Sequence, residues 1–205
     1  MRPYYEDAAV TIYHGDTREI LPTLPPVDLV LTDPPYGIGA NAMTLGSGKH
    51  KFHRGGAWDS EAPTEIVKAL PSIAEECCIW GGNYFSHVLP VTNSWFVWHK
   101  LNDGLSFSEA EMAWSNYAPQ VRVFSKYVAN KVKVHPTEKP VDVMQWCLSY
   151  SETSGAILDP FMGSGTTLRA AKDLGRKAIG IEIEERYCEI AAKRMSQSVM
   201  AFDAV

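Results

Sequence analysis

Residues 27–36 limit the possible folds of this chain more than any other segment. The first six form a short apolar run, typical of a strand buried on both faces of a parallel sheet. The run ends at Asp33, which is followed by Pro34, Pro35 and Tyr36. Consecutive prolines fix φ and lack a backbone N–H, so the chain here is stiff and its carbonyls stay free as acceptors. Because open α/β sheets bind ligands at the carboxyl ends of strands, we expect a site here for a planar group with an amino function.

Strand and helix patterns alternate along the rest of the sequence. Strands are expected at residues 10–13, 27–32, 77–80, 94–99, 109–115, 120–124, 156–158 and 177–181. Helices are expected at residues 17–24, 63–76, 83–89, 139–150, 166–174 and 184–196. This alternation predicts an α/β fold with a doubly wound, mostly parallel sheet, in which 109–115 and 120–124 form an antiparallel edge pair. The length of 205 residues suits one domain, residues 1–205.

Composition excludes several classes of protein. No apolar run reaches the roughly 18 residues of a membrane-spanning helix, and the first residues lack the apolar core of a signal peptide. The cysteines do not have the spacing of a zinc site, and no metal is expected. They are Cys77, Cys78, Cys147 and Cys188. Buried, reduced thiols are the simplest interpretation, and they predict a cytoplasmic protein.

Charge is unevenly distributed along the chain. The net charge of −5 argues against indiscriminate binding of polyanions. Residues 37–58 and 119–137 nevertheless contain basic side chains and no acidic ones. These side chains are Lys49, His50, Lys51, His53 and Arg54 in the first stretch, and Arg122, Lys126, Lys131, Lys133 and His135 in the second. Such stretches predict either a surface that faces phosphates or ordinary solvated loops.

A second constellation lies at residues 157–167, where a strand runs through a glycine-rich turn into a helix. Gly163 and Gly165 can adopt conformations closed to other residues and let a ligand approach the backbone. The following helix start offers unpaired N–H groups to a carboxylate or a phosphate. No lysine precedes Thr166, which argues against a nucleoside triphosphate site.

Glu182 ends the next strand, about twenty residues after the glycine turn. A carboxylate at that spacing is placed to accept both hydroxyls of a ribose, although a surface glutamate is the alternative. The predicted ligand therefore has a ribose and an anionic group, without a demonstrated need for phosphate. S-adenosylmethionine, which has a carboxylate, fits this description.

Three motifs together resemble a known enzyme family. Asp33-Pro34-Pro35-Tyr36 resembles the catalytic motif of amino-group DNA methyltransferases, and residues 159–167 are similar to their cofactor loop. Residues 135–140 resemble the segment that these enzymes place just before that loop. The order, with the catalytic motif first, is that of the permuted β group of N6-adenine and N4-cytosine enzymes.

This resemblance implies a Rossmann-like, seven-stranded sheet with one antiparallel strand pair, and S-adenosylmethionine as cofactor. The catalytic residues would be Asp33, Pro34, Pro35 and Tyr36. The cofactor-binding residues would be Asp16, Thr137, Lys139, Asp159, Phe161, Gly163, Ser164, Gly165, Thr166 and Glu182. Asp16 would accept from the cofactor's adenine, but an aspartate after a strand is equally a turn or a helix cap.

The mechanism implied by the resemblance follows from bond chemistry. An exocyclic amino nitrogen is a poor nucleophile because its lone pair is delocalised into the base. Asp33 and the Pro34 carbonyl would each accept one N–H hydrogen, which turns the lone pair toward the methyl group. Asp33 or a water would take the surplus proton. The target base must leave the duplex stack, and Tyr36 would offer a face for it.

The chain departs from the family pattern in one respect: residues 116–134 hold little where many β-group enzymes carry a recognition domain. We therefore expect no separate large recognition domain, and a low sequence specificity or a very short recognition site. Contacts with double-stranded DNA would come from the loops at 37–59 and 116–134. Their basic residues are Lys49, Lys51, Arg54, Arg122, Lys126 and Lys131. A homodimer on DNA would help so small a chain, in the cytoplasm of a bacterium or a phage-infected cell.

Several alternatives remain open from the sequence. Asp33 favours adenine N6 as the acceptor, because related cytosine-N4 enzymes more often carry serine at this position. Methylation of RNA or of a protein amide poses the same chemical problem, but the motif order and Asp33 argue against it. A non-catalytic cofactor- or DNA-binding module is the alternative outside enzymes, and the two intact motifs argue against that.

Overall fold

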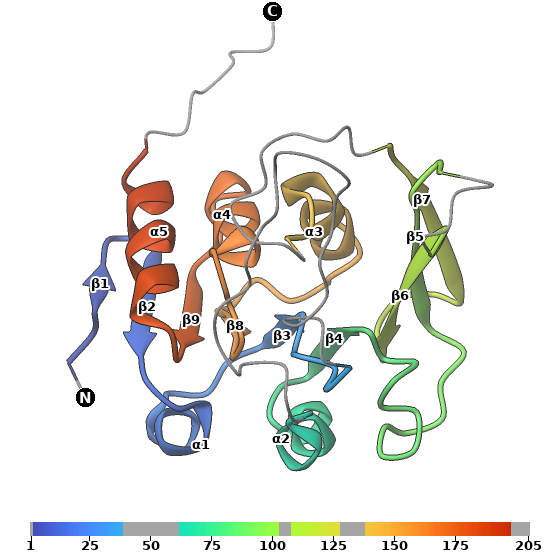
Figure 1. Ribbon diagram of the computed structural model, residues 1–205, viewed down its shortest axis with the longest axis horizontal. Coiled ribbons are helices and arrows are strands. Elements are labelled where there is room, and N and C mark those ends of the chain that lie inside the picture. The colour runs from blue at the N-terminus through green and yellow to red at the C-terminus, as the bar shows by residue number, and fades with distance from the viewer. Residues whose placement is uncertain (1, 39–61, 103–107, 128–137, 198–205) are drawn as a thin grey trace, which may run out of the picture.

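A single mixed sheet organises the computed structural model, which describes residues 2–38, 62–102, 108–127 and 138–197 (Figure 1). Nine strands of the described residues lie in the order β1-β2-β9-β8-β3-β4-β6-β5-β7. They are β1 (Tyr5–Glu6), β2 (Val10–His14), β3 (Leu29–Thr32), β4 (Glu76–Trp80), β5 (Trp95–His99), β6 (Ala110–Ser115), β7 (Val121–Ser125), β8 (Ile157–Asp159) and β9 (Ala178–Glu182). Only β1 and β6 run against the others, so the sheet is mostly parallel, as predicted.

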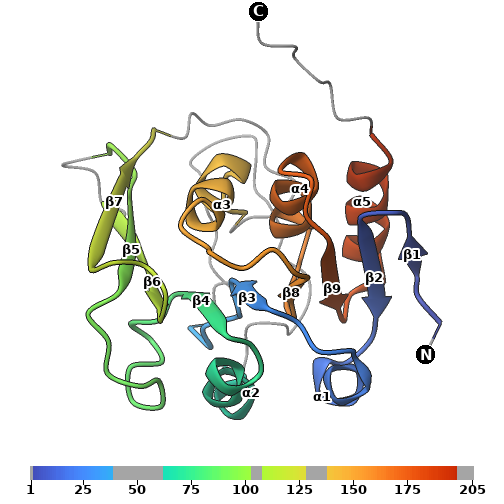
Figure 2. The same cartoon turned by 180° about the vertical axis from the view of Figure 1, so that it is seen from behind.

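Helices cover both faces of the sheet. They are α1 (Thr17–Ile20), α2 (Thr64–Ala69), α3 (Val141–Leu148), α4 (Thr166–Asp173) and α5 (Glu185–Ser196). Both views place α3, α4 and α5 on one face, and α1 and α2 on the other (Figures 1 and 2). This confirms the doubly wound architecture. None of the helices described here has the length and apolar character needed to cross a membrane.

Two hydrophobic cores explain why the central strands are apolar without interruption. Leu29 and Leu31 of β3 pack in the cluster that contains α3, α4 and α5, whereas Val30 between them packs in the cluster of α1 and α2. Successive side chains of a strand point to opposite faces, so a strand covered on both sides needs apolar residues at every position. Cys77 and Cys78 divide between the clusters in the same way. All four cysteines are buried and free, as expected.

The sheet differs from the prediction in strand number and in its antiparallel part. Residues 109–115 and 120–124 do not form an edge pair, because β5 lies between β6 and β7. β6 is antiparallel to both β4 and β5, and β7 is parallel to β5. Burial explains the order: Ala113 and Trp114 of β6 are buried, as an interior strand requires, whereas Val121 and Val123 of β7 are 53% and 62% exposed, which suits an edge. The described sheet has nine strands, whereas the resemblance implied seven, and the two-residue β1 has no counterpart among the strands expected from the sequence.

Two predicted helices were also wrong in whole or in part. Residues 83–89 form consecutive turns, with Leu89 N bonded to Phe85 O, and no regular helix. The helix expected at 63–76 ends as α2 at Ala69 and continues as a 3-10 turn, because Pro71 has no N–H to donate to the carbonyl four residues earlier. Glu76 then opens β4.

The parallel strands bring the two motifs to one edge of the sheet. β3 and β8 are neighbours, with Val30 opposite Leu158, so their carboxyl ends lie side by side. The Thr32 hydroxyl donates to Asp159 Oδ1 at 2.7 Å. Residues more than a hundred positions apart in sequence are therefore joined directly at this edge.

Candidate active site

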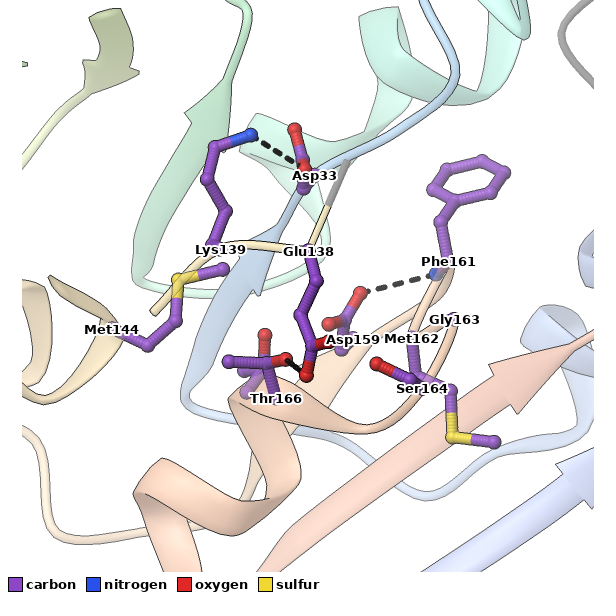
Figure 3. A pocket seen from close by; sticks show the side chains of 11 residues that line it. Asp33, Glu138, Lys139, Met144, Asp159, Phe161, Met162, Gly163, Ser164 and Thr166 are labelled. Atoms are coloured by element: carbon purple, nitrogen blue, oxygen red, sulfur yellow. Dashed lines mark hydrogen bonds and ion pairs between the residues drawn. The ribbon is translucent and has the colours of Figure 1, made fainter. Parts of the chain in front are cut away.

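Asp33 follows β3, and both of its carboxylate oxygens accept hydrogen bonds from side chains. Lys139, which lies two residues before α3, donates from Nζ to Oδ2 at 2.6 Å. The Tyr36 hydroxyl donates to Oδ1. Figure 3 shows the lysine and the carboxylate pointing toward each other across the pocket. Burial raises the pKa of Asp33, and the ammonium of Lys139 opposes that rise.

Lys139 has a second anionic partner, Glu111 of β6. Its Nζ lies 2.9 Å from Glu111 Oε2, while Lys100 lies 2.5 Å from Oε1 of the same carboxylate. Lys139 is only 4% exposed. Burial alone would lower its pKa, but Asp33 and Glu111 raise it well above the usual value. Burial alone would raise the pKa of Glu111, but Lys139 and Lys100 bring it down to about 2. The lysine and the glutamate are thus both charged.

Aromatic packing holds the Tyr36 ring. The ring stacks on Tyr84, with the centroids 4.7 Å apart and the planes at 17°. On Gly81, whose φ is +68°, a Cβ would lie 2.0 Å from the Tyr36 ring, so the ring needs a glycine there. Among the described residues, no hydrogen-bond donor reaches the Pro34 carbonyl.

The glycine turn after β8 is fixed by its neighbour strand. Met162 N donates to Ile181 O at 3.0 Å, and Gly163 N donates to Glu182 Oε2 at 3.0 Å. Gly163 has a φ of +51°, and a Cβ there would meet nothing within 4 Å, which leaves open space above the turn. Gly165 has a φ of +81° at the start of α4, and a Cβ there would approach Ala191 to 2.9 Å. Gly163 therefore borders open space, while Gly165 allows α4 to pack on α5.

One pocket joins the two motifs. It encloses about 360 Å³ of empty space, part of which is open to solvent. It is lined by Asp33, Glu138, Lys139, Met144, Asp159, Phe161, Met162, Gly163, Ser164, Thr166 and Thr167. Figure 3 shows Asp33 and Lys139 at one end and the turn with Phe161 and Ser164 at the other. The cavity thus connects the carboxylate of the first motif with the glycine turn of the second.

Two carboxylates near the turn are held by neutral donors. Asp159 Oδ1 accepts from Thr32 and from Phe161 N, and burial raises its pKa to about 6. Glu182 accepts from Gly163 N and Glu184 N, and burial raises its pKa to about 7. Among the described residues, no cationic side chain pairs with either carboxylate to offset its burial, so both groups favour a ligand that brings positive charge or hydroxyl donors.

Comparison with known proteins decides the family. A family model described as DNA methylase, for N6 and N4 enzymes, matches residues 79–193, more than half of the chain. The chain belongs to the N6/N4 DNA methylase family.

Relatives of this methylase cover almost its whole length. It is 26% identical to the type II methyltransferase M2.LlaDCHI of Lactococcus lactis subsp. cremoris, over 96% of this chain and 93% of the relative. Among solved structures, the M1.HpyAVI–SAM complex matches with a TM-score of 0.64 and 22% identity, over 92% of this chain and 100% of the other. The cytosine-N4-specific PvuII DNA methyltransferase also matches with a TM-score of 0.64, at 16% identity, over 98% and 91%. The methylase therefore has the fold of these DNA methyltransferases.

Several predicted site residues of the methylase lie outside the pocket lining. Asp16 caps the start of α1, where it accepts from Arg18 N at 2.8 Å, so the cap interpretation is confirmed. Arg122 of β7 lies over the Tyr150 ring at 5.7 Å, and Lys126 pairs with Asp142. Predicted residues outside the described ranges are Thr137, Lys49, Lys51, Arg54 and Lys131, together with residues 39–59 and 128–134 of the two predicted loops.

Other residues of the site were not predicted. Glu138, Met144 and Met162 line the pocket, and Arg194 of α5 pairs with Glu138 while donating to Thr166 Oγ1 at 3.1 Å. Glu138 lies inside the motif at 135–140, so its position carried a signal. Glu111 carried none, because a glutamate in a strand next to the sheet edge is usually a solvated side chain.

Proposed function

We propose that this DNA methylase transfers a methyl group from S-adenosylmethionine to adenine N6 in double-stranded DNA. One observation carries the proposal: the pocket that begins at the glycine turn ends at Asp33. A methyl donor bound along the turn would present its reactive end to the carboxylate that orients the acceptor. This juxtaposition suits transfer between two bound groups.

The residues of the turn fit this cofactor. S-adenosylmethionine, when bound, supplies a methyl group on a positively charged sulfur. Glu182, at the end of β9, is the acceptor for the two ribose hydroxyls. The open space above Gly163 admits a ligand close to the backbone. Asp33 and Asp159 line the pocket and provide negative charge for the cationic centre.

The motif Asp33-Pro34-Pro35-Tyr36 suits the binding of an exocyclic amino group. Asp33 Oδ and the Pro34 carbonyl accept its two hydrogens and hold the nitrogen lone pair toward the pocket. The new C–N bond would form as the bond between the methyl carbon and sulfur breaks, with its electron pair left on sulfur, and Asp33 or a water takes the surplus proton. A flipped base stacks on the Tyr36 ring, and it takes the position that Tyr84 holds in the ligand-free chain.

The choice of adenine N6 depends on Asp33. Related cytosine-N4 enzymes more often carry serine at this position. The fold does not distinguish the two acceptors, because the cytosine-N4-specific PvuII enzyme matches this chain as well as M1.HpyAVI does. Cytosine N4 is therefore the second candidate.

DNA recognition is proposed to be sparse, with a short or loosely defined site. The alignment with M2.LlaDCHI runs over 256 positions although this chain has 205 residues, so the relative holds residues that are absent here. We assign the DNA contacts to basic residues of the loops at 37–59 and 116–134. The permuted β-group order, a homodimer on DNA and a role in bacterial restriction-modification complete the proposal.

The test is transfer of tritium from labelled S-adenosylmethionine to plasmid DNA, RNA or protein. We expect label in DNA with the wild-type chain and none above background with Asp33→Ala. Glu19→Gln, in the exposed part of α1, serves as the matched control and should behave as wild type. Label in RNA or protein alone, or transfer that survives Asp33→Ala, would contradict the proposal.

A further inference from the structure

Side chains of the protein itself occupy both acceptor atoms of the Asp33 carboxylate. Lys139 holds Oδ2 and the Tyr36 hydroxyl holds Oδ1. A base whose amino group donates to this carboxylate must therefore displace a donor or share an oxygen with it. To face the methyl donor, the nitrogen must bind Asp33 from the side of the pocket. Lys139 lines the pocket on that side as well.

Lys139 can leave Asp33 and still keep a carboxylate partner, namely Glu111. Its Nζ already lies 2.9 Å from Glu111 Oε2 and 3.3 Å from the Tyr36 hydroxyl. An ammonium with three N–H groups can move between two such acceptors by a small change of its side-chain torsions. If Lys139 left Asp33, Glu111 would be its remaining carboxylate among the described residues. The lysine is only 4% exposed, and a buried unpaired charge is strongly disfavoured.

The structure assigns to Glu111 a positioning role: it receives the ammonium of Lys139 when the amino group of the target base binds Asp33. This inference rests on the proposed methylation of an amino group. Glu111 touches neither the base nor the cofactor in this account. It acts through Lys139.

The fold fixes Glu111 for this task. The residue lies in an interior strand, opposite Trp98 of β5, so its backbone cannot shift independently. Lys100 occupies Oε1 at 2.5 Å and leaves Oε2 for Lys139. The other groups that face the ammonium are Asp33, the Tyr36 hydroxyl and the Trp80 ring at 5.5 Å. Two carboxylates thus share one buried lysine, and only one of them faces the pocket.

The first test compares Glu111→Gln with Glu109→Gln, which removes the same charge from an exposed position two residues earlier. In Glu111→Gln the lysine has only Asp33, so the base competes with a tighter ion pair. We expect single-turnover methyl transfer to plasmid DNA to fall at least about tenfold. Cofactor affinity should change less than about twofold, because the Glu111 carboxylate pairs with Lys100 and Lys139 and not with the glycine turn. Glu109→Gln should match wild type in both.

A double-mutant cycle and a pH profile separate this role from a structural one. In Lys139→Met no lysine occupies Asp33, so adding Glu111→Gln should cost little more than Lys139→Met alone. The acid limb of the rate should move to higher pH in Lys139→Met, which removes a cation beside Asp33. It should move to lower pH in Glu111→Gln, which removes an anion. The inference would be overturned if the rate losses of Lys139→Met and Glu111→Gln were additive in the double variant. It would also be overturned if the acid limbs of the two single variants moved in the same direction.

A readout without turnover keeps the inference separate from the proposed function. In Asp33→Asn, Glu111 should still hold the ammonium, so the 15N-labelled Lys139 side chain should give a slowly exchanging NH3+ signal by NMR. In Asp33→Asn/Glu111→Gln that signal should be lost. Loss of the ammonium signal in Asp33→Asn would refute the role of Glu111, even if the wild-type chain methylated DNA. If the signals were as expected but the wild-type chain did not methylate DNA, only the proposed function would be refuted. If Glu111→Gln fails to fold, Glu111→Asp replaces it, because the shorter side chain withdraws the carboxylate from Lys139. A wild-type rate and a wild-type acid limb in Glu111→Asp would then overturn the inference.

Discussion

The two halves of the site hold their carboxylates in opposite ways. In the base half, formed by Asp33, Tyr36, Lys100, Glu111 and Lys139, two lysine ammonium groups neutralise the two carboxylates. In the cofactor half, formed by Asp159, the turn at 160–166 and Glu182, backbone N–H groups and a hydroxyl hold them.

This difference matches two different ligands. A base half with internal charge balance suits an uncharged base, because no net charge has to be compensated on binding. A cofactor half with raised carboxyl pKa values of about 6 and about 7 suits a ligand that brings its own cation and hydroxyl groups. If the halves are separate, a substitution in one of them should leave the function of the other largely unchanged.

Asp33→Ala should abolish catalysis while leaving the cofactor half intact. We expect kcat to fall by at least about a thousandfold, because the acceptor that orients the amino group is lost. Cofactor affinity, measured by isothermal titration calorimetry, should stay within about threefold of wild type. A large loss of cofactor affinity would show that the two halves are not separate.

Glu182→Gln should lower cofactor affinity and leave the catalytic rate largely intact, the reverse of Asp33→Ala. The amide has only one acceptor oxygen for the ribose and no charge, so we expect cofactor affinity to fall about 10- to 100-fold. The rate at saturating cofactor should change much less. Glu185→Gln, at an exposed position in the first turn of α5, is the matched control and should bind cofactor as wild type does. Equal losses in both variants would remove the special role of Glu182.

Cofactor affinity should decrease as pH falls from 8 to 5.5. Burial raises the pKa of Glu182 to about 7, so this carboxyl takes up a proton within that window and then accepts fewer hydrogen bonds. We expect a loss of about tenfold in calorimetric titrations at several pH values, which corresponds to one pKa unit of differential interaction. The loss should largely vanish in Glu182→Gln. A steep dependence that persists there would assign it to another group.

The same pKa gives a stability prediction for the cofactor-free chain. The folded state holds a proton on Glu182 up to about pH 7, whereas the unfolded state releases it near the ordinary value of about 4.5. This carboxyl therefore favours the folded state less as pH rises from about 4.5 to 7. The fall in melting temperature across that range should be smaller in Glu182→Gln, measured by differential scanning calorimetry. A variant with the wild-type pH dependence would contradict the assignment.

Tyr84→Ala should have the smallest effect. Tyr84 is 46% exposed and stacks on the ring that the flipped base would use. Removing it removes a competitor, so we expect KM for DNA to fall about threefold with kcat unchanged. Tyr36→Ala should instead raise KM. If Tyr84→Ala also raised KM, the tyrosine would belong to the base site rather than stand in for the base.

The contrast between the halves also explains what the sequence could predict. Asp33, Asp159 and Glu182 each follow or end a short apolar strand, and parallel strands place their carboxyl ends at one edge. Their convergence therefore follows from local patterns. The glycine turn was recognisable for the same reason, since Gly163 and Gly165 need the positive φ values that they have.

Glu111 and Tyr84 could not be predicted, because their contacts depend on strand order and on turns. Glu111 reaches Lys139 only because β6 runs antiparallel beside β4, which brings its first residues to the carboxyl edge of the parallel strands. The sequence-based prediction paired β6 with β7, whereas β5 lies between them. Tyr84 lies in consecutive turns where a helix was expected, so its stacking on Tyr36 has no local signature.

The central claim is that the pocket delivers a methyl group to an amino nitrogen held by Asp33. The most direct measurement is mass spectrometry of nucleosides from unmodified plasmid DNA that has been incubated with the chain and S-adenosylmethionine. We expect N6-methyladenine with the wild-type chain and none with Asp33→Ala. N4-methylcytosine would correct the acceptor base, and DNA without any methylated amino group would contradict the account.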